Sequence, residues 1–278
     1  MRITNKYGFP DALVRAVESD PYDRGLSDFT VTELIDSPRI AQLLREHDHE
    51  IEEDVSDRIW ALLGQAVHTI LERAETEARV EERLYAKVGG VTIGGQFDRL
   101  ALEENGILQD YKVTSVWSVI YGKDSWAQQL NINRFLAEQN GLKVRRLEIV
   151  AILRDWQKRE AQRNRDYPDH QVVRIPIVTW PKKKLDTYLK SRIKVHQDAA
   201  KNLPLCTDEE RWARPTKFAV MKRGLKKASR LCDTEEEAKK AAKFIPGAYV
   251  QVRPGEYPRC QDYCAVAQFC SQWKATPK

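Results

Sequence analysis

The stretch from Val91 to Thr114, VTIGGQFDRLALEENGILQDYKVT, constrains the fold of this chain more than any other. It reads as two strands joined by a turn over residues 103–106, because an Asn-Gly pair tolerates the positive φ of a hairpin turn. An antiparallel pairing centred on that turn brings Asp98 close to Asp110. Side chains alternate between the faces of a strand, so Asp110 and Lys112 project to the same side. The sequence therefore predicts that Asp98, Asp110 and Lys112 converge at one end of a sheet.

Such a convergence has a chemical use. Two carboxylates that share one site repel each other unless a cation lies between them, and oxygen ligands suit Mg²⁺ or Mn²⁺. A divalent ion activates water and neutralises charge on a phosphoryl oxygen, while the ammonium of Lys112 can hold the water or offset charge in the transition state. The pattern indicates phosphodiester hydrolysis. The alternative is a surface hairpin whose Asp and Lys side chains are only solvated.

A predicted helix precedes the hairpin. Residues 54–78 carry apolar side chains at the spacing of one helical stripe, and His68 and Glu72 lie one turn apart beside it. Gly64, one turn before His68, is expected to let the sheet approach closely. A histidine on a helix can equally be a structural residue. The stripe comprises Ile59, Leu62, Leu63, Ala66, Val67, Ile70, Leu71 and Ala74.

The order G-x-x-x-H, G-G-x-x-D, D-Y-K and then the glutamine-rich segment WAQQLNINRFL resembles the RecB-like branch of the PD-(D/E)XK nucleases. The resemblance implies an α/β fold with an α-β-β-β-α-β core, in which helices flank a central mixed sheet. It also implies that His68, Asp98, Asp110 and the backbone carbonyl of Tyr111 bind a catalytic metal ion. Lys112 would then be catalytic.

The resemblance further implies that Gln129 faces the active site. In that family a Tyr usually follows this Gln four residues later, whereas this chain has Asn133. Either Glu72 or Glu82 is expected to contribute to the site by contacting the metal ligands without binding the ion directly.

Other elements are predicted from caps and periodicity. Thr30 or Ser27 can cap a helix, with Glu33 completing a capping box after Thr30. Further helices are expected at 11–18, 124–139, 182–201 and 234–244, and strands at 145–153, 171–178, 217–221 and 248–253.

Charge is unevenly distributed along the chain. Residues 1–82 contain 19 acidic and 9 basic side chains, a net charge of −10. Because the whole chain has a net charge of +5, the remaining residues carry +15. Residues 143–165 hold eight basic and three acidic side chains. Basic side chains interleaved with aromatic ones suit a phosphate backbone with stacked bases, although they can also form a solvated helical face. The predicted DNA-binding residues are Arg154, Trp156, Lys158, Arg159 and Arg163.

Hydropathy predicts a soluble protein located in the cytoplasm. No run of 18 apolar residues occurs, and Met1 to Asp20 lacks the apolar segment of a signal peptide. We expect an N-terminal helical segment over residues 1–53, a nuclease core over 54–203 and a cysteine-rich subdomain over 204–278.

The five cysteines, at 206, 232, 260, 264 and 270, all lie in the last third of the chain. An odd count argues against a disulfide framework in an intracellular protein. Zinc favours paired C-x2-C knuckles, whereas a 4Fe-4S cluster accepts irregular spacing; zinc and plain buried thiols remain alternatives. The RecB-like resemblance implies such a cluster, with Cys260, Cys264 and Cys270 as ligands. Cys206 is preferred over Cys232 as the fourth, and Ser37 replaces a cysteine that the family commonly has.

These features predict a metal-dependent DNA nuclease, expected to be an exonuclease that acts on DNA ends or single strands in phage or host recombination or repair. The expected cofactors are Mg²⁺ or Mn²⁺ and a 4Fe-4S cluster. The expected partner is DNA, with a homo-oligomer or a recombination complex as further possibilities. The alternatives are a non-catalytic DNA-binding or redox-sensing protein on the same scaffold and a subunit that is active only when docked to a partner.

Overall fold

The computed structural model describes residues 1–19, 23–103 and 106–276. By its internal contacts the chain divides into two compact units, Met1–Leu203 and Pro204–Lys278. Among the described residues, no helix combines the length and the apolar character that crossing a bilayer requires.

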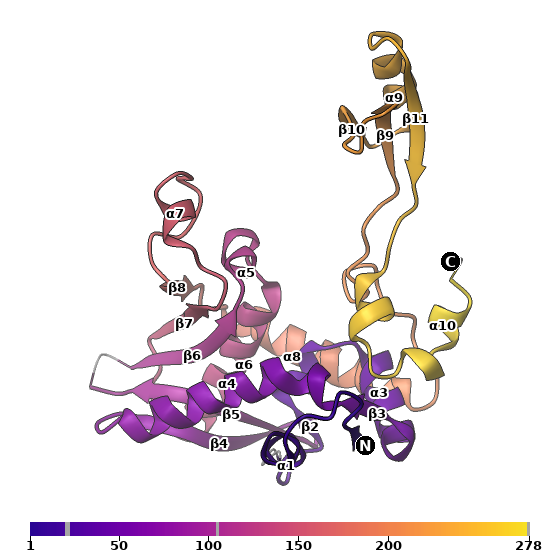
Figure 1. The fold of residues 1–278 in the computed structure, drawn as a ribbon. Coiled ribbons are helices and arrows are strands. Elements are labelled where there is room, and N and C mark those ends of the chain that lie inside the picture. The colour runs from indigo at the N-terminus through magenta and orange to yellow at the C-terminus, as the bar shows by residue number, and fades with distance from the viewer. Residues whose placement is uncertain (20–22, 104–105, 277–278) are drawn as a thin grey trace. The chain divides into compact units, whose positions relative to one another are not determined.

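The first unit is built on a six-stranded mixed sheet (Figure 1). Its order is β2-β5-β6-β7-β8, and β4 pairs with β5. The β6–β7 and β2–β5 pairs are parallel, and the other pairs are antiparallel. The strands are β2 (Phe29–Thr30), β4 (Arg79–Val88), β5 (Val91–Ala101), β6 (Ile107–Thr114), β7 (Arg146–Leu153) and β8 (Val172–Ile177).

Helices flank this sheet on both sides. In Figure 1, α4 crosses the near face, whereas α6 and α8 lie behind the sheet. A parallel pair, β1 (Arg2–Thr4) with β3 (Glu52–Asp54), leads into α4. The helices are α1 (Asp11–Glu18), α2 (Val31–Ile35), α3 (Pro38–His47), α4 (Val55–Ala74), α5 (Val116–Tyr121), α6 (Asp124–Gln139), α7 (Lys158–Ala161) and α8 (Lys182–Ala199).

The predicted mixed α/β class is confirmed. The order α4, β4, β5, β6, α6, β7 matches the α-β-β-β-α-β core that the resemblance implies, with the short α5 added after β6. The capping box between Thr30 and Glu33 forms as predicted and starts α2. A second capping box, between Asp54 and Asp57, starts α4. These boxes satisfy backbone N–H groups that have no partner within the helix.

Gly95 of β5 lets α2 and α6 pack closely against the sheet. A Cβ atom on Gly95 would lie 2.5 Å from Val31, 2.6 Å from the side-chain oxygen of Asn133 and 2.8 Å from Leu136. Asn133 is buried and donates to the backbone oxygen of Gln96. Position 133 is therefore a packing position beneath β5. Gly64, by contrast, has open space where a Cβ would be, so the expectation that it admits the sheet was wrong.

The hairpin has the predicted register. Arg99 pairs with Gln109, Leu100 with Leu108 and Ala101 with Ile107, so Asp98 and Asp110 each lie one position beyond the last pair. Glu104 and Asn105 of the predicted turn lie outside the described residues. Gly106 has a φ of 65°, the left-handed conformation that favours glycine.

The second unit contains a small three-stranded antiparallel sheet of order β10-β9-β11. Its strands are β9 (Lys217–Lys222), β10 (Arg230–Cys232) and β11 (Ala248–Arg253), and helix α9 (Glu235–Lys243) covers one face. Val220, Cys232 and Ala238 form the buried centre of this packing. The chain ends with a cysteine-bearing segment and the short helix α10 (Ser271–Lys274).

Candidate active site

His68 lies in the middle of α4, and its side chain contacts residues of β4, β5 and β6. Its Nδ1 lies 3.1 Å from Oε1 of Glu81 and 3.7 Å from Oδ2 of Asp98. Its Nε2 lies 3.2 Å from the carbonyl oxygen of Tyr111. The hydrogen bond with Glu81 raises the pKa of His68, burial opposes this shift, and the charges of Asp98, Glu81 and Asp110 add to it. Two groups that the sequence suggested as ligands, the imidazole and the Tyr111 carbonyl, therefore meet.

The two predicted carboxylates are buried side by side. Asp98 is 8% exposed and Asp110 is 1% exposed. Burial, followed by the charge of Asp110, raises the pKa of Asp98 to about 7. The backbone N–H of Tyr111 donates to Oδ2 of Asp98 across 2.6 Å and fixes its orientation. The proximity of Asp110 thus opposes ionisation of Asp98.

Lys112 and Gln129 contact the two oxygens of Asp110. Nζ of Lys112 lies 2.6 Å from Oδ2, and Nε2 of Gln129 donates to Oδ1 across 2.8 Å. Burial lowers the pKa of Lys112, but the charges of Asp110 and Asp98 raise it by more, so its pKa is raised overall. Lys112 is therefore held as an ammonium, and Gln129 reaches the site from α6 as the resemblance implies.

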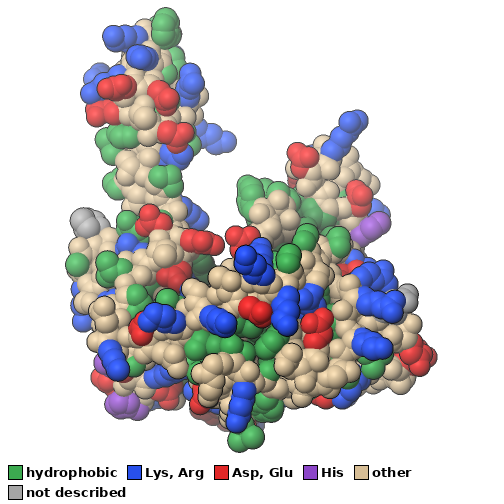
Figure 2. All heavy atoms as spheres, turned by 180° about the vertical axis from the view of Figure 1, so that it is seen from behind, with side chains coloured by type: hydrophobic (Ala, Val, Ile, Leu, Met, Phe, Trp, Pro, Cys, Tyr) green, Lys and Arg blue, Asp and Glu red, His purple; other side chains and the backbone are tan. Residues whose placement is uncertain are grey.

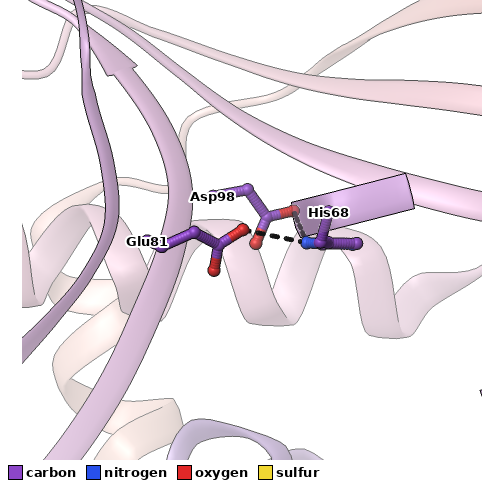
Figure 3. Close-up of side chains that lie close together, drawn as sticks. All are labelled: His68, Glu81 and Asp98. Carbon is purple, nitrogen blue, oxygen red and sulfur yellow. Dashed lines mark hydrogen bonds and ion pairs between the residues drawn. The ribbon is translucent and has the colours of Figure 1, made fainter. Parts of the chain in front are cut away.

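The sequence did not single out Glu81, which joins His68 and Asp98 (Figure 3). Ligand atoms of these three residues all lie within 4.8 Å of one another. Glu81 has a φ of 48°, unusual for a residue other than glycine, and regular β4–β5 pairing skips it. Glu82, which the sequence suggested instead, accepts hydrogen bonds from Arg79, and Glu72 is exposed. The left-handed backbone at Glu81 explains why strand alternation alone could not find it.

The donor set fits a hard divalent cation. Carboxylates from Asp98 and Glu81, an imidazole and a backbone carbonyl are the ligand types that Mg²⁺ and Mn²⁺ accept. Within the described part of the chain, the buried Oδ2 of Asp110 has no hydrogen-bond partner of good geometry beside its ion pair with Lys112. A cation here would also relieve the repulsion that raises the pKa of Asp98. The residues present therefore suit a divalent metal ion.

Two further cations lie near Lys112, and exposed aromatic rings occur on α4 and α5. Burial, then the charges of Lys112 and Arg154, lower the pKa of Lys123, so three cationic groups lie near one another. The guanidinium of Arg154 lies 4.2 Å from the ring centroid of Trp60 on α4. On α5, directly after β6, Trp117 and Tyr121 stack with ring centroids 5.8 Å apart, and they are 55% and 79% exposed.

The residues predicted to bind DNA divide into two groups. Arg154, Lys158, Arg159 and Arg163 are exposed. Trp156 is half-buried, packs against the main core and donates from Nε1 to the backbone oxygen of Pro168. The Trp156 ring therefore packs within the protein, unlike the four exposed basic side chains. On the face drawn in Figure 2, basic side chains are interspersed with acidic ones.

The cysteines of the second unit do not form a compact ligand group. Among the residues that the structure describes, the group of ligand atoms within 4.8 Å is His68, Glu81 and Asp98, without a cysteine. Burial raises the pKa of the Cys264 thiol, and the neighbouring Cys260 and Cys270 raise it further. Gln272 donates to the backbone oxygen of Cys206 and accepts from its N–H. Cys232 instead lies in the apolar core beneath α9.

The chain is thus a mixed α/β protein with a partly buried site formed by carboxylates, a histidine and a lysine. No family model matches the chain, and no curated protein matches it. Among solved structures it is similar to SSO0001, with 18% identity and a TM-score of 0.48, over 66% of this chain and 84% of the other. It is also similar to an alkaline exonuclease (LHK-Exo) from Laribacter hongkongensis, with 13% identity and a TM-score of 0.37, over 63% and 90%. Similarities at this level do not bear on function.

Proposed function

We propose that this chain is a divalent-metal-dependent deoxyribonuclease. The observation that carries the proposal is the meeting of Asp98, Asp110 and Lys112 with His68 in one buried site. Two acids held together with an ammonium and an imidazole match the needs of phosphodiester hydrolysis, in which negative charge increases on phosphoryl oxygens.

His68, Asp98, Asp110, Glu81 and the carbonyl of Tyr111 would hold the ion. When bound, a divalent cation supplies Lewis acidity and lowers the pKa of a water molecule. Lys112 uses one N–H for Asp110 and has two further N–H groups for the attacking water or a phosphoryl oxygen. Gln129 orients Asp110, and the Tyr111 N–H orients Asp98. The reaction adds water across one P–O bond, leaving a phosphate monoester and a hydroxyl group.

The surroundings favour a substrate with accessible bases. Lys123 and Arg154 attract the phosphate backbone, and Trp60, Trp117 and Tyr121 offer rings on which bases stack. Bases inside a duplex cannot reach such rings. We therefore assign DNA ends or single strands as the substrate, with Arg154, Lys158, Arg159 and Arg163 as backbone contacts.

Digestion of end-labelled linear and circular DNA, single- and double-stranded, tests this function. The proposal expects degradation with Mg²⁺ or Mn²⁺, loss of degradation with EDTA and recovery when the ion is restored. Linear or single-stranded DNA should be degraded faster than closed circular duplex. Absence of any metal-dependent cleavage by the pure protein would leave a DNA-binding protein or a partner-activated subunit as the better account.

We further propose that the second unit binds a 4Fe-4S cluster through Cys206, Cys260, Cys264 and Cys270. The support is the influence of both Cys260 and Cys270 on the thiol of Cys264 and the two hydrogen bonds that tie Cys206 to Gln272, two residues after Cys270. Burial of Cys232 in an apolar core argues for a packing role at that position. Thiolate bonds of this kind stabilise a fold, because metal binding and folding are coupled.

A further inference from the structure

The small sheet of the second unit has one covered face and one open face. Phe218, Val220, Cys232, Ala248 and Val250 pack on the side of α9. The alternate positions point away from the helix, and register aligns Leu231, Ala219 and Gln251 across the three strands and Met221 with Tyr249. Leu231 is 55% exposed and Tyr249 is 46% exposed. Ala219 and Met221 of the central strand are themselves buried, so the exposed part of this face consists of Leu231, Tyr249 and Gln251 on the flanking strands.

Positive charge is concentrated in and next to the β9–β10 connection, at one end of the sheet. Residues 222–230, KRGLKKASR, hold five basic side chains and no acidic one. All five are exposed, and within the described residues none of them takes part in an ion pair. Arg253, on the open face of β11, adds a sixth cation beside Met221. Of the acidic side chains near this sheet, Asp233 is paired with Lys217, and Glu235, Glu236 and Glu237 lie in the first turn of α9.

We propose that the open face of β9–β10–β11 and its basic connection form a second DNA-binding site, which takes duplex DNA. Unpaired lysine and arginine side chains attract phosphates, and Tyr249, Gln251 and Leu231 are suited to contact base edges. Three strands spaced about 4.8 Å apart are about 10 Å wide between the outer backbones, which suits a major groove about 12 Å wide. The deep, narrow major groove of A-form RNA does not admit such a sheet.

This site lies wholly within the second unit and does not need the carboxylate centre. It would hold duplex DNA for the nuclease proposed above, but its binding can be measured with divalent ions removed. Failure of this binding and failure of cleavage are therefore separate results.

The test is fluorescence anisotropy of the full chain with a labelled duplex, in EDTA and over a range of salt concentrations. The variant Lys226→Glu/Lys227→Glu is compared with Lys240→Glu/Lys243→Glu, which makes the same change in net charge on exposed positions of α9. We expect the first variant to lose about ten-fold or more in affinity and to lower the salt slope by about 2, and the second to change affinity much less. Equal losses in the two variants would overturn the proposal.

A second comparison tests the sheet face itself. Tyr249→Ala should weaken duplex binding, whereas Phe244→Ala, which removes an 86%-exposed ring at the end of α9, should not. Circular dichroism and the thermal midpoint confirm that each variant is folded. A duplex RNA of the same sequence should bind more weakly than the DNA. Equal effects of Tyr249→Ala and Phe244→Ala, or equal binding of duplex RNA, contradict the groove-binding proposal.

Discussion

Nζ of Lys112 lies 2.6 Å from Oδ2 of Asp110, two positions earlier on the same strand. Asp110 is 1% exposed, so this contact and the hydrogen bond from Gln129 take the place of solvating water around its carboxyl group. A buried carboxylate without a cation costs several kcal/mol, on the order of 3 to 5 when one partner of a buried pair is removed. The pair therefore stabilises the buried charges of the site, and under the proposed function it sets Lys112 beside the reacting atoms.

Glu81 and Glu82 offer a matched test of the ligand set. Glu81→Gln removes a carboxylate that lies beside His68 and Asp98, whereas Glu82→Gln removes one that binds Arg79. We expect the first change to weaken Mn²⁺ binding about ten-fold or more and the second to leave it nearly unchanged. Isothermal titration of Mn²⁺ into each protein measures this difference. Equal affinities would exclude Glu81 from the site.

The two glycines in the site's supporting elements should respond oppositely to alanine. Gly95→Ala places a Cβ within 3 Å of Val31, Asn133 and Leu136 and should lower the free energy of unfolding by about 1 to 3 kcal/mol. Gly64→Ala meets open space inside α4 and should raise it by about 0.5 to 1 kcal/mol. Urea denaturation of both variants gives the comparison. Destabilisation by Gly64→Ala would mean that α4 approaches its neighbours more closely than described.

His196 makes the stability of the first unit depend on pH. Burial, and then the charge of Arg192, lower the pKa of His196 from 6.5 to about 4, with Glu33 opposing this and Arg45 adding to it. Nη2 of Arg192 lies 3.2 Å from Nε2 of His196, a contact that suits the neutral ring.

The unfolded chain therefore binds a proton at His196 at a higher pH than the native chain does. The stabilising contribution is complete above pH 6.5 and is lost as the pH falls toward about 4, by roughly 3 kcal/mol at most. The free energy of unfolding of wild type and His196→Gln, measured between pH 4 and 7.5, should diverge in this window. Parallel pH profiles would contradict the assignment.

The cluster proposal predicts different effects at Cys264 and Cys232. Cys264→Ser should reduce bound iron and the absorbance near 400 nm in anaerobically purified protein, because it removes a ligand. Cys232→Ser should retain the iron and only lower stability, because it places a hydroxyl in an apolar core. Iron retained in full by Cys264→Ser would remove that residue from the ligand set. Stoichiometric zinc in the purified protein, in place of iron, would show that the cysteines form a zinc site.

The sequence predicted those parts of the fold that depend on local signals. Helices α1 and α6 begin and end at the expected residues, and the β5–β6 register follows from alternation and a short turn. Asp98, Asp110 and Lys112 could be identified for the same reason, because the hairpin alone brings them together.

Features that depend on tertiary packing could not be predicted. The run after Thr114, Val116-Trp-Ser-Val-Ile-Tyr, has strand-forming residues yet forms the helix α5, which presents Trp117 and Tyr121. The apolar stripe of α4 is only partly covered, with Leu63 at 38% and Ile70 at 55% exposed, because covering it needs neighbours that the pattern does not specify. The raised pKa of Asp98 depends on its burial and on the nearby charge of Asp110. Both arise from tertiary packing, which the sequence pattern does not specify.

The cleavage rate of Lys112→Met and Asp110→Asn on end-labelled DNA, at saturating Mn²⁺, tests the central claim most directly. We predict that each variant loses about 100-fold or more in rate and still binds DNA within a few-fold of wild type, since positioned charges contribute about that much to such reactions. Circular dichroism establishes that the variants are folded. Wild-type cleavage by either variant would contradict the assignment of Asp110 and Lys112 to the reacting centre.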